Sequence, residues 1–291
     1  MFATLIGAYP AAHDVLSADE AVRGVVEELA TAGLEPISDG LGAEQAAGPD
    51  DAERIVAAWR HAASFTDRAV KQALVGPYSL ARGTEFAPIA ESIRATIEAL
   101  AAAGCQMIEI EEPAAVEVGQ DSGERRRFGD ALRTATEGLG DQVHLSLVLT
   151  GGNADGIGPA TIYDLPFSSY AFDLVAGPEN WRLIAAAPAD RGIVCGALDP
   201  SADVADSPEV LIWAAHYAAS LKGRGLVRVG LANASSLAGL PRERARAKVQ
   251  ALAEAARLAA IASPEDLGAA LDPRAVDIRS AALGRYTPRD K

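Results

Sequence analysis

Short runs of apolar and β-branched residues alternate along the chain with longer stretches in which apolar residues recur every three or four positions. The short runs predict strands, and the longer stretches predict amphipathic helices. The expected strands are residues 4–6, 35–38, 69–75, 107–111, 143–149, 171–175, 192–196 and 226–229. The expected helices cover or begin near residues 17–29, 50–59, 89–100, 128–139, 178–184, 207–221 and 241 onward.

Strands that alternate with helices are typical of a parallel sheet with crossover helices. Eight expected strands in order, all but the fifth followed by an expected helix, with no break in composition, predict one closed α/β (β/α)8 TIM barrel as a single domain. The 291 residues exceed the usual ~150 per domain, but barrels of this class commonly do. We expect the barrel over residues 1–262 and a C-terminal extension, residues 263–291, packed on it.

Composition and charge limit the classes of partner. Hydrophobic residues make up 49% of the chain and charged residues 23%, as in ordinary globular domains. The net charge of −14 argues against nucleic acid or an anionic membrane as partner, whereas a small-molecule substrate of either sign stays open. The two cysteines, the lack of a signal peptide and the lack of a charge-free apolar stretch of ~18 residues predict a cytoplasmic protein without a membrane span.

Barrel enzymes place their active sites at the carboxyl ends of the strands, where the loops converge. That rule selects polar side chains near the expected strand ends as candidate site residues. They are Tyr9, Asp39, Tyr78, Glu109, Glu111, Glu112, His144, Asn153, Asp173, Asp199 and Asn233.

The fourth expected strand carries the most informative pattern. Glu109 and Glu111 are two residues apart and therefore face the same way, into the barrel. Two neighbouring carboxylates repel each other and raise at least one pKa, which suits a proton donor or a cation ligand. The alternatives are that Glu109 pairs with Lys71 on the neighbouring strand, and that Glu112, which precedes a proline, is merely solvated.

The remaining candidates carry weaker signals. His144 starts the fifth strand, where a residue at the bottom of the barrel is the more common role than a ligand. Cys195 is more simply a small buried hydrophobic residue. The chain has no nucleophile elbow and no P-loop, and Thr150–Asn153 matches no dinucleotide fingerprint.

Several segments near the expected strand ends resemble, in order, motifs of the cobalamin-independent methionine synthase family. The most specific is Gly104–Ala114, which is similar to that family's Gly-…-Ile-Gln-Ile-Asp-Glu-Pro-Ala. The others are Leu5–Pro10, Gly33–Gly40, Leu74–Leu80, Phe172–Val175 and Gly196–Asp199. The resemblance spans about residues 2–262 and implies the barrel fold and methyl-transfer chemistry.

The departures from the family concern its zinc site. The family's His-x-Cys corresponds to His144–Ser146, its glutamate after the sixth strand falls near Val175, and its last cysteine falls near Asn233. One histidine out of four ligands does not make a tetrahedral zinc site. The family's serine in the first motif is Ala8, and its glutamate after Asp-Gly is Leu41. The resemblance therefore implies a stand-alone barrel closer to the metal-free half of the family's two-barrel enzymes, with no metal cofactor.

Three functions follow from these observations. The first is a methyltransferase or related one-carbon enzyme without zinc, in which Glu111 orients or deprotonates the acceptor, Glu112 helps to hold it, and the implied methyl donor is a folate or a corrinoid. The second is a metal-free decarboxylase or lyase, for which only Arg82 and Arg228 are available as carboxylate clamps. The third is a non-catalytic barrel that pairs with a zinc-bearing catalytic subunit. A homo-oligomer is also open.

Overall fold

The computed structural model describes residues 1–11, 17–48, 51–201 and 206–261. The C-terminal extension expected over residues 263–291 lies outside these described residues. No helix in the described part of the chain combines the length and the apolar character that a membrane crossing requires.

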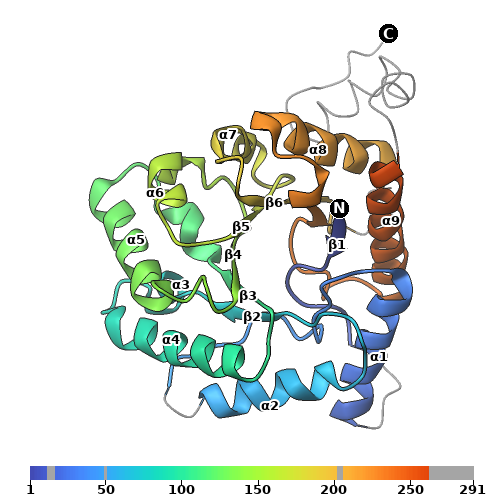
Figure 1. The fold of residues 1–291 in the computed structure, drawn as a ribbon, viewed down its shortest axis with the longest axis horizontal. Helices are drawn as coiled ribbons and strands as arrows, with labels where there is room; N and C mark the ends of the chain where they lie inside the picture. The colour runs from blue at the N-terminus through green and yellow to red at the C-terminus, as the bar shows by residue number, and fades with distance from the viewer. Residues whose placement is uncertain (12–16, 49–50, 202–205, 262–291) are drawn as a thin grey trace.

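The described chain forms a seven-stranded parallel sheet with the order β1-β7-β6-β5-β4-β3-β2. The strands are β1 (Phe2–Thr4), β2 (Gln72–Val75), β3 (Met107–Glu111), β4 (His144–Leu149), β5 (Ser169–Asp173), β6 (Gly192–Leu198) and β7 (Val229–Asn233). Figure 1 shows that the sheet is curled and that the helices surround it on the outside. This arrangement confirms the α/β class and the parallel topology.

The longer helices match the expected amphipathic stretches. They are α1 (Ala18–Ala32), α2 (Asp51–Ala63), α4 (Ala87–Ala102), α5 (Ser122–Thr136), α8 (Pro208–Ser220) and α9 (Arg242–Ile261). The short helices are α3 (Pro77–Ala81), α6 (Pro159–Tyr163) and α7 (Trp181–Ala186). The Ser17 hydroxyl accepts a hydrogen bond from the Glu20 amide, which confirms the predicted N-cap of α1.

The second expected strand, residues 35–38, is not a regular strand in the structure. Ile37 forms only an isolated parallel bridge with Val70, although the Glu35 amide donates to the Ala3 carbonyl at 2.9 Å. The physical reason is Pro36, which has no N–H to donate to a neighbouring strand. The segment therefore links β1 to the edge of β2 through a few backbone hydrogen bonds instead of a full ladder.

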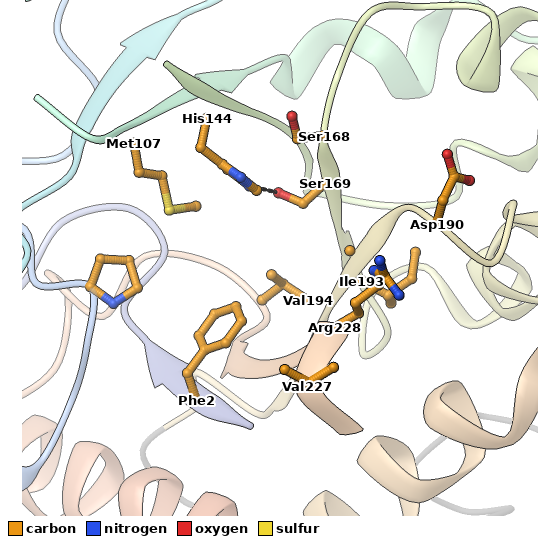
Figure 2. Close-up of a pocket in the computed structure, with 12 residues that line it drawn as sticks. Phe2, Met107, His144, Ser168, Ser169, Asp190, Ile193, Val194, Val227 and Arg228 are labelled. Atoms are coloured by element: carbon orange, nitrogen blue, oxygen red, sulfur yellow. Dashed lines mark hydrogen bonds between the residues drawn. The ribbon is translucent and has the colours of Figure 1, made fainter. Parts of the chain in front are cut away.

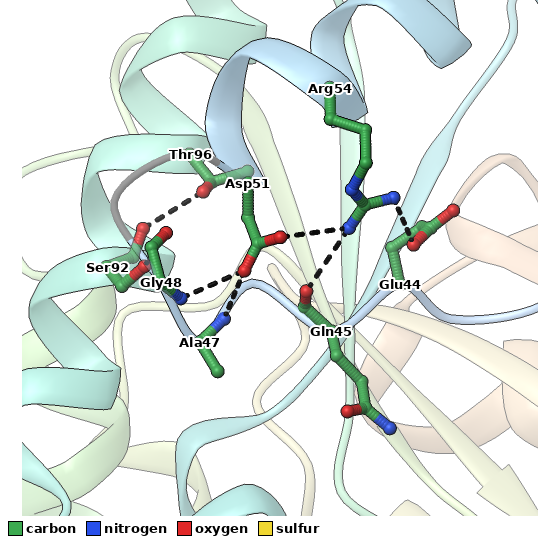
Figure 3. A network of polar contacts seen from close by, with 8 residues as sticks. All are labelled: Glu44, Gln45, Ala47, Gly48, Asp51, Arg54, Ser92 and Thr96. Atoms are coloured by element: carbon green, nitrogen blue, oxygen red, sulfur yellow. Dashed lines mark hydrogen bonds and ion pairs between the residues drawn. The ribbon is translucent and has the colours of Figure 1, made fainter.

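The loop that follows also covers the edge of β2. Glu44 forms an isolated parallel bridge with Leu74, and its carboxylate accepts from Arg54 of α2 at 2.9 Å. Asp51 at the start of α2 bonds the Gly48 amide at 2.9 Å, and this hydrogen bond is the main reason why the Asp51 pKa is lowered. Figure 3 shows how these contacts fix the loop to α2.

Three further strand predictions need correction. The first expected strand, residues 4–6, lies two residues earlier, at Phe2–Thr4. Residues 226–228 form a 3-10 turn, and the last strand begins at Val229. Gly225, with φ +76°, starts this turn in a conformation that favours glycine. The sixth expected strand lies two residues earlier, at Ser169–Asp173. These errors arise because apolar runs continue into the turns that flank the strands.

The two faces of the sheet differ in character. The outer face and the surrounding helices form the large hydrophobic core. The inner face carries a small apolar cluster of Ile6, Val148, Ala171, Val194 and Ala232. The buried polar residues Lys71, Glu109 and Ser146 also belong to the inner-facing positions of their strands.

Candidate functional site

The side chains of β3 alternate between the two faces of the sheet, as the sequence predicts. Ile108 and Ile110 are fully buried in the outer core. Glu109 and Glu111 face inward, where Glu109 is aligned with Ser146 of β4 and Glu111 with Val148. The two carboxylates therefore share the interior of the curled sheet.

Glu109 is paired with Lys71, which confirms the pairing that the sequence left open. The Lys71 Nζ lies 2.7 Å from Glu109 Oε2, and both side chains are 1% exposed. The same Nζ donates to the Leu5 carbonyl at 2.6 Å. Lys71 thus neutralises one interior carboxylate and anchors it to the end of β1.

Glu111 has no such cation of its own. It is partly exposed, its Oε1 is buried without a hydrogen-bond partner in the described part of the chain, and the Gly7 amide is near its carboxylate. The pKa of Glu111 is raised to about 7, mainly by burial and also by the charge of Glu109, while Lys71 opposes the shift. A carboxyl group with a pKa near neutrality can both give and take a proton.

Ser146 completes an inner polar cluster, which we define as Lys71, Glu109, Glu111 and Ser146. The Ser146 side chain is fully buried, and its Oγ has no hydrogen-bond partner among the described residues. Buried polar atoms are normally satisfied, so an unpartnered hydroxyl beside two carboxylates indicates a place where a polar group is received. Sequence alternation together with the register to Glu109 would have identified this residue.

Glu112, although adjacent in sequence, serves the outer layer. Its carboxylate accepts hydrogen bonds from the Tyr78 amide at 2.9 Å and the Ser79 amide at 2.8 Å, and from the Ser79 hydroxyl. A Cβ at Gly76 would lie 2.2 Å from the Glu112 carboxyl carbon, so the glycine makes room for this contact. Glu112 is 0% exposed, and the expectation of a solvated side chain is therefore wrong. Burial raises its pKa to about 7.

The two candidate tyrosines point to the outer helices. The Tyr9 hydroxyl donates to Glu28 of α1, and Arg242 of α9 lies over its ring at 5.7 Å. The Tyr78 hydroxyl donates to Glu124 of α5 at 2.7 Å. Burial raises the pKa of both tyrosines. These contacts tie the first and third loops to helices, and the structure does not bring the two hydroxyls to Glu111.

Asp173 and Asn233 hold backbone groups at the carboxyl ends of β5 and β7. Asp173 accepts from three backbone amides, those of Gly151, Val175 and Ala176, at 2.8–3.0 Å. Asn233 accepts from the Ile6 amide at 3.0 Å and donates to the Ile6 carbonyl at 2.6 Å. Both side chains therefore shape the loops around the interior, and their predicted contact with substrate stays a prediction.

The other three predicted binding residues also bond backbone amides at loop turns. Asp39 accepts from Leu41 at 2.9 Å, Asn153 from Glu179 at 2.8 Å, and Asp199 from Ser201 at 2.7 Å. Burial raises the pKa of Asp39, and the charge of Glu44 adds to this effect. Asp39 and Asp199 stabilise their own loops, whereas Asn153 ties its loop to the turn at Glu179, and the substrate roles assigned to all three from the sequence stay predictions.

The positions that correspond to the zinc ligands of the resembled family do not form a donor set. His144 Nε2 bonds the Ser169 hydroxyl at 2.8 Å at the amino end of the sheet, while Asn233 bonds backbone at the opposite end. Cys195 is fully buried on the outer face, with its Sγ 3.7 Å from the Ala214 carbonyl of α8. Across residues 1–11, 17–48, 51–201 and 206–261, no three His, Cys, Asp or Glu residues are grouped to hold a metal ion.

Comparison with known proteins places the fold. No family model matches the chain, and no curated protein matches it in sequence. A B12-independent methionine synthase from Shewanella sp., solved with selenomethionine, is 14% identical, with a TM-score of 0.73 over 88% of this chain and 96% of that one. A putative vitamin-B12-independent methionine synthase from Listeria monocytogenes is also 14% identical, with a TM-score of 0.67 over 88% and 97%.

A sugar epimerase shares the same architecture. D-psicose 3-epimerase from Clostridium cellulolyticum is 12% identical, with a TM-score of 0.58 over 89% of this chain and 99% of that one. At such identities the likeness concerns the fold alone. The chain therefore shares the parallel α/β fold of these solved structures, and its chemistry has to be argued from its own side chains.

Proposed function

We propose that the chain is a methionine synthase-like methyltransferase, or a related one-carbon transfer enzyme, that works without a catalytic zinc. The carrying observation is Glu111, an interior carboxyl group with a pKa of about 7 and one unpartnered buried oxygen. The fold likeness to two methionine synthases supports the reaction class. In this proposal the sheet and the bridging segment at Ile37 together act as a closed (β/α)8 barrel whose interior holds the acceptor.

In the proposed reaction Glu111 manages the proton of the acceptor. A thiol acceptor loses its proton to the Glu111 carboxylate, and its sulfur attacks the methyl carbon of the donor. The bond between that carbon and the donor would break with its electron pair on the donor. With a folate donor, Glu111 would return the proton to the nitrogen that is released; with a corrinoid donor, the proton would leave to solvent. Because a free thiol has a pKa of about 8.5, a base with a pKa near 7 deprotonates it at moderate cost.

Lys71 and Glu109 influence the pKa of the carboxyl group that carries the proton. The charge of Glu109 favours the proton-carrying form of Glu111, and the paired Lys71 opposes this effect. Ser146 supplies a hydroxyl that can bond the incoming acceptor. The donor is proposed to be a folate or a corrinoid, and the setting is proposed to be the cytoplasm.

A methyl-transfer assay tests this proposal. Thiol, amine and hydroxyl acceptors are offered with methyl-folate or methyl-corrinoid donors to the wild type, to Glu111→Gln and to Glu117→Gln. Glu117 is an exposed residue of the same segment and serves as the matched control. We expect Glu111→Gln to lower kcat by about 10²–10⁴-fold, the usual contribution of a general acid–base group, and Glu117→Gln to leave it unchanged. Equal rates in all three proteins would remove Glu111 from the mechanism.

One set of observations favours a second function, the non-catalytic partner barrel. Most of the predicted binding residues are engaged with backbone or helices, which leaves few free groups around the interior. A zinc-bearing second barrel that co-purifies with the chain, or is encoded beside it, would favour this function. No activity in the acceptor panel together with a stable complex would establish it.

The decarboxylase or lyase alternative loses support. Its substrate clamp needs arginines at the carboxyl end of the strands, but Arg228 precedes β7 and so lies at the amino end. Arg82 is exposed at the end of α3. Neither guanidinium lies with the inner polar cluster.

A further inference from the structure

A cavity of about 390 Å³ opens at the amino end of the sheet, opposite to the end where Glu111 lies. Its wall is built from the first residues of several strands, among them Phe2, Met107, His144 and Ser169. The volume falls in the range of small-ligand sites, roughly 300–1,000 Å³. The amino end of a barrel normally serves stability, so an open volume there requires an explanation.

Glycine keeps part of this volume free. A Cβ on Gly230 would lie 2.4 Å from the ring of Phe2, so the ring lies directly against the backbone of β7. Any larger residue at 230 would push the ring away from the strand. The ring of Phe2, from β1, thus lies flat against β7. It forms an apolar wall of the cavity and does not fill it.

The lining of the cavity is divided into a polar and an apolar side. Figure 2 shows Asp190 and Arg228 on one side, with Phe2 and Met107 on the other. Val227 at the rim is 79% exposed, which is unusual for a large apolar side chain. The lining therefore offers an apolar surface opposite two charged groups of different sign.

The charged side chains of Asp190 and Arg228 can interact with a ligand. Within the described residues, Asp190 and Arg228 form no hydrogen bond or ion pair with any other side chain, nor with each other. His144 is oriented by its hydrogen bond to the Ser169 hydroxyl at 2.8 Å. Desolvation lowers the pKa of His144, so the ring is neutral at pH 7 and can exchange a hydrogen bond with a ligand.

We propose that this amino-end cavity binds a small zwitterion with an apolar tail, of the chemical class of the aliphatic α-amino acids. The carboxylate of the ligand lies toward Arg228 and its ammonium group toward Asp190. The tail packs on Phe2, Met107 and Val194. A ligand with one charge would pair with only one of the two charged side chains, and a ligand without a tail would leave the apolar side in contact with water.

Binding of four probes to the full chain tests the charge pattern. The probes are L-leucine, 4-methylpentanoate, which lacks the ammonium group, isoamylamine, which lacks the carboxylate, and glycine, which lacks the tail. Titration calorimetry or chemical-shift perturbation gives the Kd of each. We expect L-leucine to bind most tightly and glycine most weakly, because the tail buries apolar surface.

Two variants at exposed positions separate the two charges, and both should leave the fold intact. Arg228→Gln should raise the Kd of L-leucine and of 4-methylpentanoate at least about threefold and leave isoamylamine unchanged. Asp190→Asn should raise the Kd of L-leucine and of isoamylamine at least about threefold and leave the Kd of 4-methylpentanoate unchanged. The matched control is Arg257→Gln on α9, which should change no Kd.

Three results would overturn the proposal. The first is no detectable binding of L-leucine at about 10 mM. The second is equal binding of all four probes. The third is a Kd of L-leucine that neither Arg228→Gln nor Asp190→Asn changes. Since no step depends on methyl transfer, these results are independent of the assay on Glu111.

Discussion

The two ends of the inner face of the sheet are built from the same strands but differ in chemistry. At the carboxyl end, β3 presents Glu111 beside a buried ion pair, and most polar side chains of the loops are used to hold backbone. At the amino end, β4 presents His144 beside a cavity with an apolar side. Glu111 is aligned with Val148, four residues along β4 from His144, so this short length of strand separates the carboxyl group from the cavity.

The difference shows what each end requires from the fold. Buried carboxylates need fixed partners, so the carboxyl end depends on Lys71 and on loops that are held in place. The amino end needs only an open volume between the first residues of the strands. Gly192 and Gly230 help to keep it open, because they carry no Cβ. Substitutions at the carboxyl end should therefore lower the free energy of unfolding strongly, and substitutions at the amino end should change it little.

The largest effect is expected for Lys71→Met. The substitution leaves Glu109 buried without its cation, so we expect the free energy of unfolding to fall by about 3–5 kcal/mol. Urea unfolding at pH 7, followed by circular dichroism, measures the change. The double variant Lys71→Met/Glu109→Gln should recover most of the loss, because no unpaired charge remains. If the free energy of unfolding of the single variant fell by less than about 1 kcal/mol, the ion pair would not be a main source of stability at the carboxyl end.

The next effect is a pH dependence that belongs to Glu111. Its pKa in the folded chain is about 7, above the value of 4.5 for an unperturbed glutamate. A raised pKa in the folded state gives stability that is fully present below pH 4.5 and is lost as the pH rises through 7. From pH 5 to 8 the wild type should therefore lose up to about 3 kcal/mol relative to Glu111→Gln.

Unfolding curves at half-unit steps of pH test this difference. Glu117→Gln, the exposed control, should follow the wild type throughout. Parallel curves for the wild type and Glu111→Gln would show that the carboxyl group titrates normally, and would weaken its assignment as a proton carrier at the same time.

The smallest effect is expected for His144→Gln at the amino end. The residue is exposed as a whole, its ring is part-buried, and the substitution removes one hydrogen bond, to Ser169, so the free energy of unfolding should change by less than about 1 kcal/mol. The pH dependence assigned to Glu111 should be unchanged, because the two groups lie at different ends of the inner face. A shift of that profile in His144→Gln would show that the two ends are coupled and would contradict the comparison.

Local pattern accounts for much of what the sequence predicted. The alternation along β3 placed Glu109 and Glu111 on one face, and the spacing of apolar residues located the longer helices. The pairing of Glu109 with Lys71 was one of the alternatives that the neighbouring strands left open, and the structure decided for it. These features depend on residues within one or two elements, where the periods of the backbone decide which side chains share a face.

The tertiary structure decided where the remaining polar groups act. Glu112 and Tyr78 looked like site residues because of their place in the chain, but their partners are α3 and α5, and no local pattern states which helix lies beside a loop. The segment at Pro36 and the amino-end cavity likewise depend on strands that are far apart in sequence. The sequence by itself determined the parallel α/β architecture and the interior acids, since periodicity is a local property. Only the packing of distant elements determined which acids are satisfied and which keep a free oxygen.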